Sequence, residues 1–177
     1  MLVVRCTTKL QKLVGRPDRE TASLRASGDD WYANLLWIDG RKCLLATHAG
    51  TLLSVFVPDV RARDLRPIGS FVVPRIHGQL AAEGFPPDAL GVLDPSESLI
   101  AKTADRSVIG CMNDVALTCQ YAVADAGGLP RLDLVGLHRR LQRNIASARG
   151  YVQPVDLVAA RHHDDGARRQ SDGTDVA

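Results

Sequence analysis

Trp31-Tyr-Ala-Asn-Leu-Leu-Trp-Ile-Asp39 opens the segment that decides the fold, and Gly40-Arg-Lys42, Cys43-Leu-Leu-Ala-Thr-His48, Ala49-Gly50 and Thr51-Leu-Leu-Ser-Val-Phe-Val57 follow it. The three longer runs are rich in aromatic, β-branched and other apolar residues, which is typical of β-strands. Asp39-Gly40 favours a tight hairpin turn because both positions tolerate positive φ, and Ala49-Gly50 can serve similarly. We therefore predict three consecutive strands in an antiparallel meander, with one face packed on helices.

Short elements are expected on both sides of this meander. A strand over residues 2–6 and a helix over 9–14 precede it. A helix over 70–84, with Pro74 in its first turn, and a short strand over 99–102 follow it.

Two amphipathic helices are predicted in the last third of the chain. The stronger pattern, over 107–124, has apolar residues at helical spacing: Val108, Met112, Val115, Cys119 and Ala122. The second helix begins after Asp133, and its apolar stripe is Leu134, Leu137, Leu141 and Ile145. The predicted fold class is therefore α+β, an antiparallel β-meander packed against a few amphipathic helices.

Length and composition favour one domain. The chain has 177 residues, of which 45% are hydrophobic and 24% charged, as in ordinary globular proteins. We predict a single domain over 1–160, in which an apolar segment over 151–160 docks as a strand or turn. From Arg161 onward almost nothing can be buried, so residues 161–177 are predicted to form a disordered tail.

The charge balance excludes a strong whole-protein field. The formal net charge is +2, so a site for a polyanion must be a local patch. No apolar run approaches the roughly 20 residues that cross a bilayer. The N-terminus also lacks the long apolar region of a signal peptide. These features predict a cytoplasmic protein with no membrane partner.

The cysteines do not indicate a metal or redox site. Cys6, Cys43, Cys111 and Cys119 are widely separated, and none has the Cys or His spacing of zinc ligands. We predict reduced thiols that pack as small hydrophobic groups, no metal site and no cofactor. No pattern in the sequence indicates an oligomeric state.

Five segments of the chain form a distinctive set: Asp30-Trp-Tyr-Ala-Asn-Leu-Leu-Trp37, Arg41-Lys-Cys-Leu-Leu45, Ala101-Lys-Thr103, Arg106-Ser-Val-Ile-Gly-Cys-Met-Asn-Asp114 and Arg149-Gly-Tyr-Val-Gln-Pro154. Together they resemble a bacterial protein family described only as a domain of unknown function. The resemblance covers nearly all of residues 1–160, and it implies one domain in a bacterial, intracellular setting. It implies no activity, cofactor or catalytic residue.

Polar residues surround the predicted start of the helix over 107–124. A helix start presents free backbone N–H groups that can hold a phosphate or a carboxylate. The candidate anion- or substrate-binding residues here are Lys102, Arg106, Ser107, Asn113 and Asp114. The alternative interpretation is capping of the helix by Asp105 or Ser107, with the other polar residues on the surface.

The exposed side of the following helix is rich in arginine. The candidate nucleic-acid-binding residues are Arg139, Arg140 and Arg143, and the stripe can be extended by Arg131, Arg149, Lys9 and Lys12. Such a stripe could neutralise several phosphates and give a salt-dependent affinity. The alternative is a solvated helix face whose charge is balanced by acidic groups elsewhere.

A catalytic hypothesis depends on His48 and His138. These histidines, with Asp39, Asp114 or Asn34 as partners, would supply the minimum for general acid–base catalysis. No spacing connects them and no nucleophile motif is present, so the catalytic residues remain unidentified.

The aromatic residues of the first meander strand alternate between its two faces. Trp31 and Trp37 share one face, while Tyr32 lies on the other. This arrangement favours core packing, with a partner-binding surface as the alternative.

Two classes of function therefore stay open. The first is a non-enzymatic binding module that contacts nucleic acid or a protein partner through the basic helix face. The second is an enzyme or a small-anion-binding protein that uses the polar cluster over residues 102–114.

Overall fold

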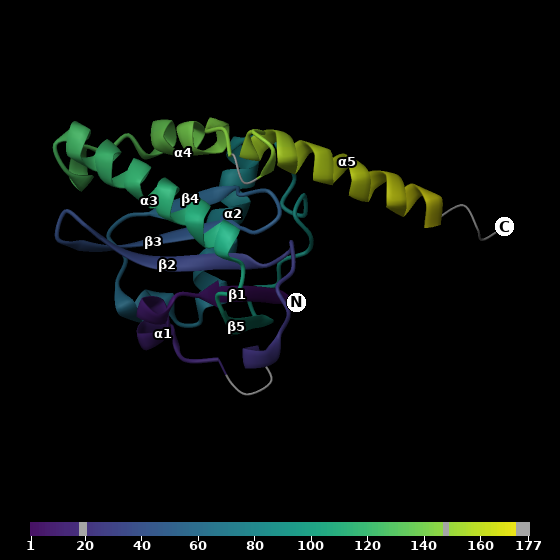
Figure 1. Cartoon of the computed structure of the whole chain (residues 1–177), viewed down its shortest axis with the longest axis horizontal. Coiled ribbons are helices and arrows are strands. Elements are labelled where there is room, and N and C mark those ends of the chain that lie inside the picture. The colour runs from purple at the N-terminus through teal and green to yellow at the C-terminus, as the bar shows by residue number, and fades with distance from the viewer. Residues whose placement is uncertain (18–20, 147–148, 173–177) are drawn as a thin grey trace.

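A five-stranded mixed sheet forms the centre of the protein in the computed structural model, which describes residues 1–17, 21–146 and 149–172 (Figure 1). The order of the strands is β4-β3-β2-β1-β5. Their bounds are β1 Leu2–Cys6, β2 Trp31–Ile38, β3 Arg41–His48, β4 Ser54–Val57 and β5 Ser98–Lys102. Strands β2, β3 and β4 pair antiparallel, which confirms the predicted meander. β1 extends the sheet by pairing in parallel with both β2 and β5.

The two turns of the meander differ. Asp39 and Gly40 have φ values of 53° and 69°, so the β2–β3 turn has the predicted left-handed pair. The β3–β4 connection is longer than a turn centred on Ala49-Gly50 would be. Its left-handed residue is Leu52, with φ 59°, and the amide of Leu52 donates to the carbonyl of His48. Strand β4 consequently begins only at Ser54.

Helices cover both faces of the sheet. α1 (Thr8–Val14) and α2 (Ile68–Ala82) pack on one face, and α3 (Arg106–Ala126) and α4 (Leu134–Arg143) pack on the other. Short 3-10 turns are η1 (Thr21–Ser23), η2 (Ala62–Leu65) and η3 (Leu129–Arg131). The α+β class is confirmed, and the meander is buried on both faces.

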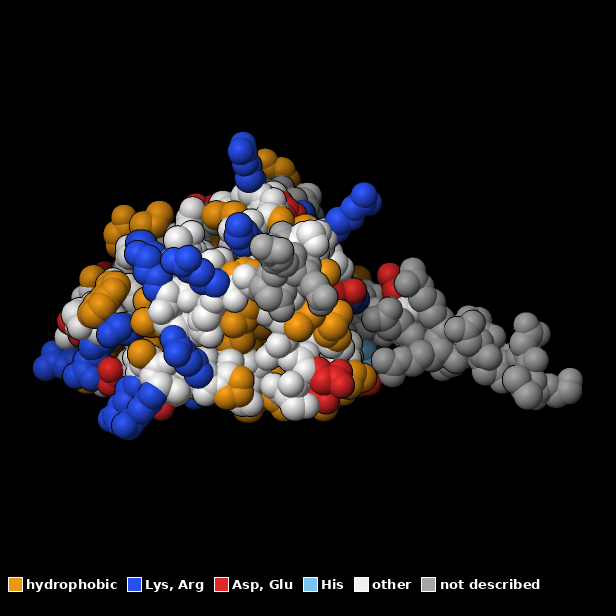
Figure 2. Space-filling view, turned by 90° about the horizontal axis from the view of Figure 1, so that it is seen from below, with side chains coloured by type: hydrophobic (Ala, Val, Ile, Leu, Met, Phe, Trp, Pro, Cys, Tyr) orange, Lys and Arg blue, Asp and Glu red, His pale blue; other side chains and the backbone are white. Residues whose placement is uncertain are grey.

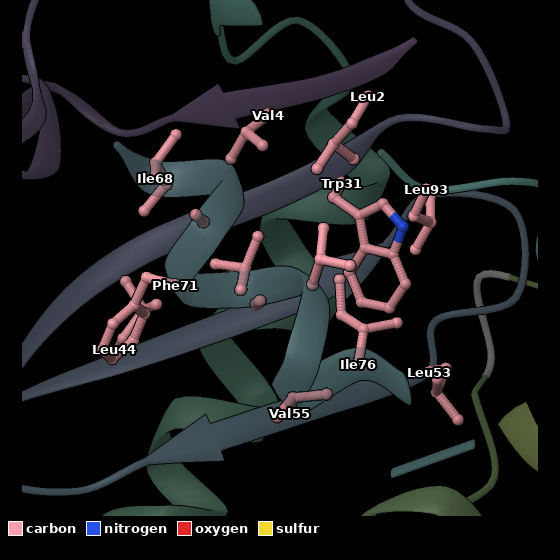
Figure 3. Close-up of a cluster of buried hydrophobic side chains, with 14 of the residues drawn as sticks. Leu2, Val4, Trp31, Leu44, Leu53, Val55, Ile68, Phe71, Ile76 and Leu93 are labelled. Atoms are coloured by element: carbon pink, nitrogen blue, oxygen red, sulfur yellow. The ribbon is translucent and has the colours of Figure 1, made fainter. Parts of the chain in front are cut away.

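Alternation along β2 distributes its side chains between the two cores. Trp31 lies in the core on the α2 side, where Figure 3 shows it close to Ile76 and Leu93. Tyr32 lies in the core on the α3 side, with Met112. Both predicted packing roles are therefore confirmed, and each core contains one large aromatic residue of β2.

Helix α3 is fixed at both ends by local contacts. The carboxylate of Asp105 accepts a hydrogen bond from the amide of Ser107, as an N-cap should. Gly127 ends the helix in the left-handed conformation, with φ 78°. The predicted apolar stripe faces the sheet: Met112 is fully buried, and Val115 is half-buried.

Two other helices depart from the predictions. α2 begins at Ile68, so Pro74 lies inside the helix and not in its first turn. α5 (Pro154–Asp172) replaces the strand or turn expected over 151–160, and it continues through residues 161–172, where disorder was expected. The physical reason is that α5 starts with proline at a favourable position and buries Val158 in the α2-side core. Residues 173–177 lie outside the described part of the chain.

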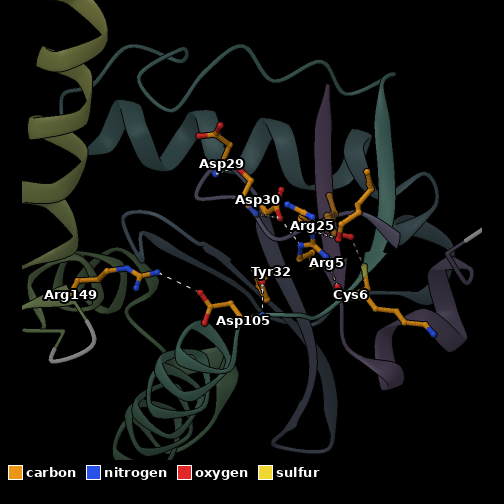
Figure 4. Close-up of polar contacts among 12 residues, drawn as sticks. Arg5, Cys6, Arg25, Asp29, Asp30, Tyr32, Asp105 and Arg149 are labelled. Carbon is orange, nitrogen blue, oxygen red and sulfur yellow. Dashed lines mark hydrogen bonds and ion pairs between the residues drawn. The ribbon is translucent and has the colours of Figure 1, made fainter. Parts of the chain in front are cut away.

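A buried ion pair connects β1 to the loop before β2. Arg5 Nε is 2.5 Å from a carboxylate oxygen of Asp30, and both side chains are almost fully buried. The other guanidinium nitrogens of Arg5 donate to the carbonyls of Leu24, Arg25 and Lys102. Figure 4 shows this network at the end of β1. One side chain thus fixes the loop against both parallel strands.

Candidate functional site

The predicted anion-binding cluster begins at a helix end that the chain itself caps. Asp105 accepts hydrogen bonds from the amide and the hydroxyl of Ser107, at 2.8 and 2.7 Å. The hydrogen bonds from Ser107 hold the pKa of Asp105 below its ordinary value. Arg149 lies 4.0 Å from the other carboxylate oxygen (Figure 4). A carboxylate of the protein therefore occupies the position that an external anion would need.

The other members of this cluster do not meet in one place. Lys102, at the end of β5, is exposed. Arg106 and Asn113 are exposed seven residues apart on α3, a rise of roughly 10 Å along the helix. Asp114 lines a cavity that none of the other four lines. The cluster is thus spread along β5 and the outer side of α3.

The three arginines of α4 are exposed as predicted, but acidic groups lie among them. Arg143 donates to Glu83 at 2.8 Å, and this carboxylate raises the pKa of Arg143. Arg140 lines a hollow of about 290 Å³ whose walls also include Arg131, Asp125 and Asp133. We define the α4 face by Arg139, Arg140 and Arg143, and part of its positive charge is therefore balanced locally.

Two groups expected to extend this stripe lie elsewhere. Arg149 is half-buried and donates to the carbonyl of Ala49, so it does not lie on the exposed face of α4. Lys9 and Lys12 belong to α1, which packs on the opposite face of the sheet (Figure 1).

A second basic surface, not recognised from the sequence, lies on α1 and the segment around η2. Figure 2 shows Lys and Arg side chains gathered over the side of the molecule on which Figure 1 places α1. We call this the α1 surface and define it by six exposed basic residues: Lys9, Lys12, Arg16, Arg61, Arg63 and Arg66. Within the described residues 8–17 and 61–67, Asp64 is the one acidic side chain.

The packing of α1 holds these cations on one side. Leu10 is fully buried in the α2-side core. Lys9, Lys12 and Arg16 follow one another at spacings of three and four residues, and all three are exposed to solvent. The guanidinium of Arg66 donates to the carbonyl of Leu13, which ties the η2 segment to α1. The spacing of the lysines was a usable signal, but the contact between α1 and η2 is not encoded by any local pattern.

His48 and His138, the two histidines of the catalytic hypothesis, form contacts within the fold. His48 is fully buried, its Nδ1 lies 2.9 Å from the Thr51 hydroxyl, and burial lowers its pKa to about 3. His138 Nε2 lies 3.0 Å from both the amide and the carbonyl of Phe56. These contacts give both imidazoles a structural role.

Trp37 differs from the other two aromatic residues of β2. Its indole is 59% exposed, and Lys42 Nζ lies 4.8 Å from the ring centre, a cation–π contact. Trp37 is therefore a surface residue and not part of either core, so the core packing expected for it is wrong.

The described residues contain no group of three or more His, Cys, Asp or Glu side chains that could hold a metal ion. No disulfide joins the four cysteines, and Cys111 is more accessible than the other three. Within the same part of the chain, no helix has both the length and the apolar character needed to cross a membrane.

The fold and its surfaces define an α+β domain with a mixed sheet, helices on both faces and a basic patch on one side. The chain belongs to the family described as Domain of unknown function (DUF6933), whose family model matches residues 3–157. No curated protein matches the chain, and no solved structure matches it.

Proposed function

We propose that this protein is a non-enzymatic binding module that contacts the phosphate backbone of duplex nucleic acid through the α1 surface. The observation that carries this proposal is the charge of the surface: six exposed cations on adjoining segments, with Asp64 as the acidic side chain in the same described residues. A partner with closely spaced negative charges complements such a patch. A cytoplasmic location, where nucleic acid is accessible, is part of the same proposal.

The absence of large exposed hydrophobic side chains from residues 8–17 and 61–67 favours a duplex. Single-stranded nucleic acid is usually held by bases stacked on aromatic side chains, and membrane surfaces are usually bound with inserted apolar residues. The large hydrophobic side chains exposed in the described chain, such as Trp37 and Tyr121, lie outside residues 8–17 and 61–67. The surface can therefore contact phosphates but has no stacking platform.

The α1 surface is a better candidate than the α4 face for an electrostatic reason. Arg143 is paired with Glu83, and Asp125 and Asp133 lie beside Arg140. On the α1 surface, Arg63 lies 3.5 Å from Asp64, and this pair is well exposed to solvent. Such an exposed pair is weak, so Arg63 can exchange its partner for a phosphate at little cost.

Salt dependence gives the proposal a quantitative form. Each phosphate that a cation neutralises contributes a slope of about −0.9 to the plot of log affinity against log salt for a DNA duplex. Contacts from four of the six cations would give a slope of about −3.6. Because contacts to phosphates carry no sequence information directly, we expect little discrimination between duplex sequences.

A fluorescence anisotropy titration of a short labelled duplex across a salt series tests the proposal. Replacing Lys9 and Lys12 together by Glu should weaken binding by tenfold or more, roughly 1.4 kcal/mol, and should reduce the salt slope by about two. The matched control replaces Arg139 and Arg140 by Glu, which changes the net charge equally on α4. The control should retain most of the affinity.

Two results would contradict the proposal. Absence of saturable binding at low salt would exclude nucleic acid as the partner. Equal losses in the two double variants would show that only net charge matters, or that the α4 face contributes as much as the α1 surface. Circular dichroism of both variants separates either result from unfolding.

A further inference from the structure

A cavity on the side of the sheet opposite the α1 surface has the size and composition of a small-molecule site. Its volume is about 300 Å³, at the lower end of the range for ligand pockets, about 300–1,000 Å³. It lies between α3, the end of α4 and the start of α5, beside Leu52 from the β3–β4 connection. At about 30 Å³ for each water-sized group, it can hold roughly ten non-hydrogen atoms.

The lining is largely apolar and carries one charged side chain. The apolar contributors are Leu52, Val115, Leu141, Ile145, Ala146 and Pro154. The polar contributors are Asp114, Thr118, Asn144 and Cys111. This lining suits a ligand that has an apolar body and one polar group. It does not suit a sugar, which needs many hydrogen-bonding partners.

Asp114 determines which polar group can enter. Its carboxylate forms no ion pair within the described residues, and the Thr118 hydroxyl donates to its backbone carbonyl, 3.0 Å away, and not to the side chain. A carboxylate repels an anionic ligand and attracts an ammonium group, whose N–H groups can donate to it.

We propose that this cavity binds a small organic ammonium ion, whose apolar body lies against Leu52, Val115 and Leu141 and whose N–H groups donate to Asp114. The inference goes beyond the proposed nucleic-acid binding and is independent of it, because α1 and α3 lie on opposite faces of the sheet. The site also differs from the predicted anion site, since Asp114 acts here as an acceptor for a cation.

Calorimetry of the full chain with a panel of aliphatic, alicyclic and aromatic primary ammonium ions, including phenethylammonium, tests this proposal. Each ammonium ion is compared with its neutral alcohol of the same shape. We expect at least one member to bind and to exceed its alcohol in affinity by about tenfold, the contribution of a charge-assisted hydrogen bond at a partly exposed site.

Variants locate the interaction. Asp114→Asn should abolish the preference for the ammonium ion over the alcohol, while Asp125→Asn, the same charge change elsewhere on α3, should leave it intact. Thr118→Phe fills the cavity and should prevent binding of both ligands. Alkylation of Cys111, which lines the cavity and is the most accessible thiol, should slow when the ammonium ion is bound.

The proposal is overturned if no ammonium ion of the panel binds to folded protein, or if ammonium ion and alcohol bind equally. Loss of the preference in Asp125→Asn to the same extent as in Asp114→Asn would also overturn it, because the effect would then be one of overall charge. Circular dichroism shows whether each variant has kept its fold.

Discussion

Gln142 forms hydrogen bonds with both backbone groups of Ser54. Its side-chain oxygen accepts from the Ser54 amide at 3.1 Å, and its side-chain nitrogen donates to the Ser54 carbonyl at 2.6 Å. Four residues earlier on α4, His138 Nε2 lies within hydrogen-bonding distance of the backbone of Phe56. Because β4 is an edge strand, α4 supplies with side chains the partners that a sixth strand would otherwise provide.

Replacing Gln142 by Ala should destabilise the fold strongly. Both the amide and the carbonyl of Ser54 would lose their partner in a buried position, at about 1–3 kcal/mol each. We expect the free energy of unfolding in urea to fall by about 2–6 kcal/mol. Arg139→Ala, on the exposed side of the same helix, should change it by no more than about 0.5 kcal/mol. A similar loss in both variants would show that α4 contributes through packing alone.

Acid should destabilise the protein through His48 and His138, whose pKa values are lowered in the fold. Burial lowers the pKa of His48 to about 3, and it also lowers the pKa of His138, from an ordinary value of 6.5. The unfolded state therefore binds more protons, and stability is lost as pH falls below about 6.5. His48 alone should contribute a loss of about 2 kcal/mol by pH 5.

Urea unfolding between about pH 7 and pH 5 measures this effect. The variant His48→Gln cannot take up the proton, so its stability should depend less steeply on pH than that of the wild type. Since carboxylates titrate equally in both proteins, the difference between the two slopes isolates His48. Parallel slopes would mean that His48 is protonated as easily in the folded protein as in the unfolded chain.

Breaking the ion pair between Arg5 and Asp30 should be among the most damaging single changes. Asp30→Asn would leave the buried guanidinium without its counter-charge, at a cost of about 3–5 kcal/mol. Limited proteolysis should then cut the loop before β2 faster than in the wild type. The control is Arg41→Ala, which removes an exposed ion pair with Asp59 and should cost less than about 1 kcal/mol. Equal costs would contradict a special role for the buried pair.

A carboxylate at position 112 should prevent folding. Met112 is fully buried between α3 and the sheet, so Met112→Asp must either bury a charge or protonate it at a raised pKa. We expect insoluble or unfolded protein in an expression and circular dichroism assay. Val135→Asp, at a 69% exposed position of α4, should stay soluble and folded. A folded Met112→Asp protein would show that α3 is not anchored where the structure places it.

Truncation before Arg161 should have a moderate effect. It removes the ion pair of Arg161 with Asp29, whose side chain is largely exposed, but it keeps Val158 in the core. We expect a cost of about 1 kcal/mol or less in urea unfolding. Val158→Asp should cost several times more, because it places a carboxylate in the α2-side core. A truncation more harmful than Val158→Asp would mean that residues 161–172 contribute more than the contacts of Arg161.

The meander and the two main amphipathic helices were predictable because their signals are local. Asp39-Gly40 fixes one turn by its backbone preferences, and the stripe through Met112 fixes the buried side of α3. The pairing of β1 with both β2 and β5 was not predictable, since it joins segments that are far apart in sequence. α5 was missed because its anchoring by Val158 depends on a core that forms only in three dimensions.

The candidate sites likewise combine features that have local sequence signals with features that depend on tertiary contacts. Exposure of Arg139, Arg140 and Arg143 followed from the helical pattern, but the ion pair of Arg143 with Glu83 depends on a tertiary contact. Capping by Asp105 was one of two interpretations of the start of α3, and the structure has this cap, since the amide of Ser107 donates to the Asp105 carboxylate. The α1 surface was not predictable because its two halves, Lys9 to Arg16 and Arg61 to Arg66, are separated in the sequence by the whole meander.

The placement of helices on opposite faces of the sheet has a thermodynamic consequence. A ligand at Asp114 and a polyanion on the α1 surface would be separated by the sheet and two packed cores, with no shared side chain. Unless the sheet itself has two arrangements, occupation of one site leaves the affinity of the other unchanged. The domain is therefore expected to behave as two independent receptors on one scaffold, with a coupling free energy close to zero.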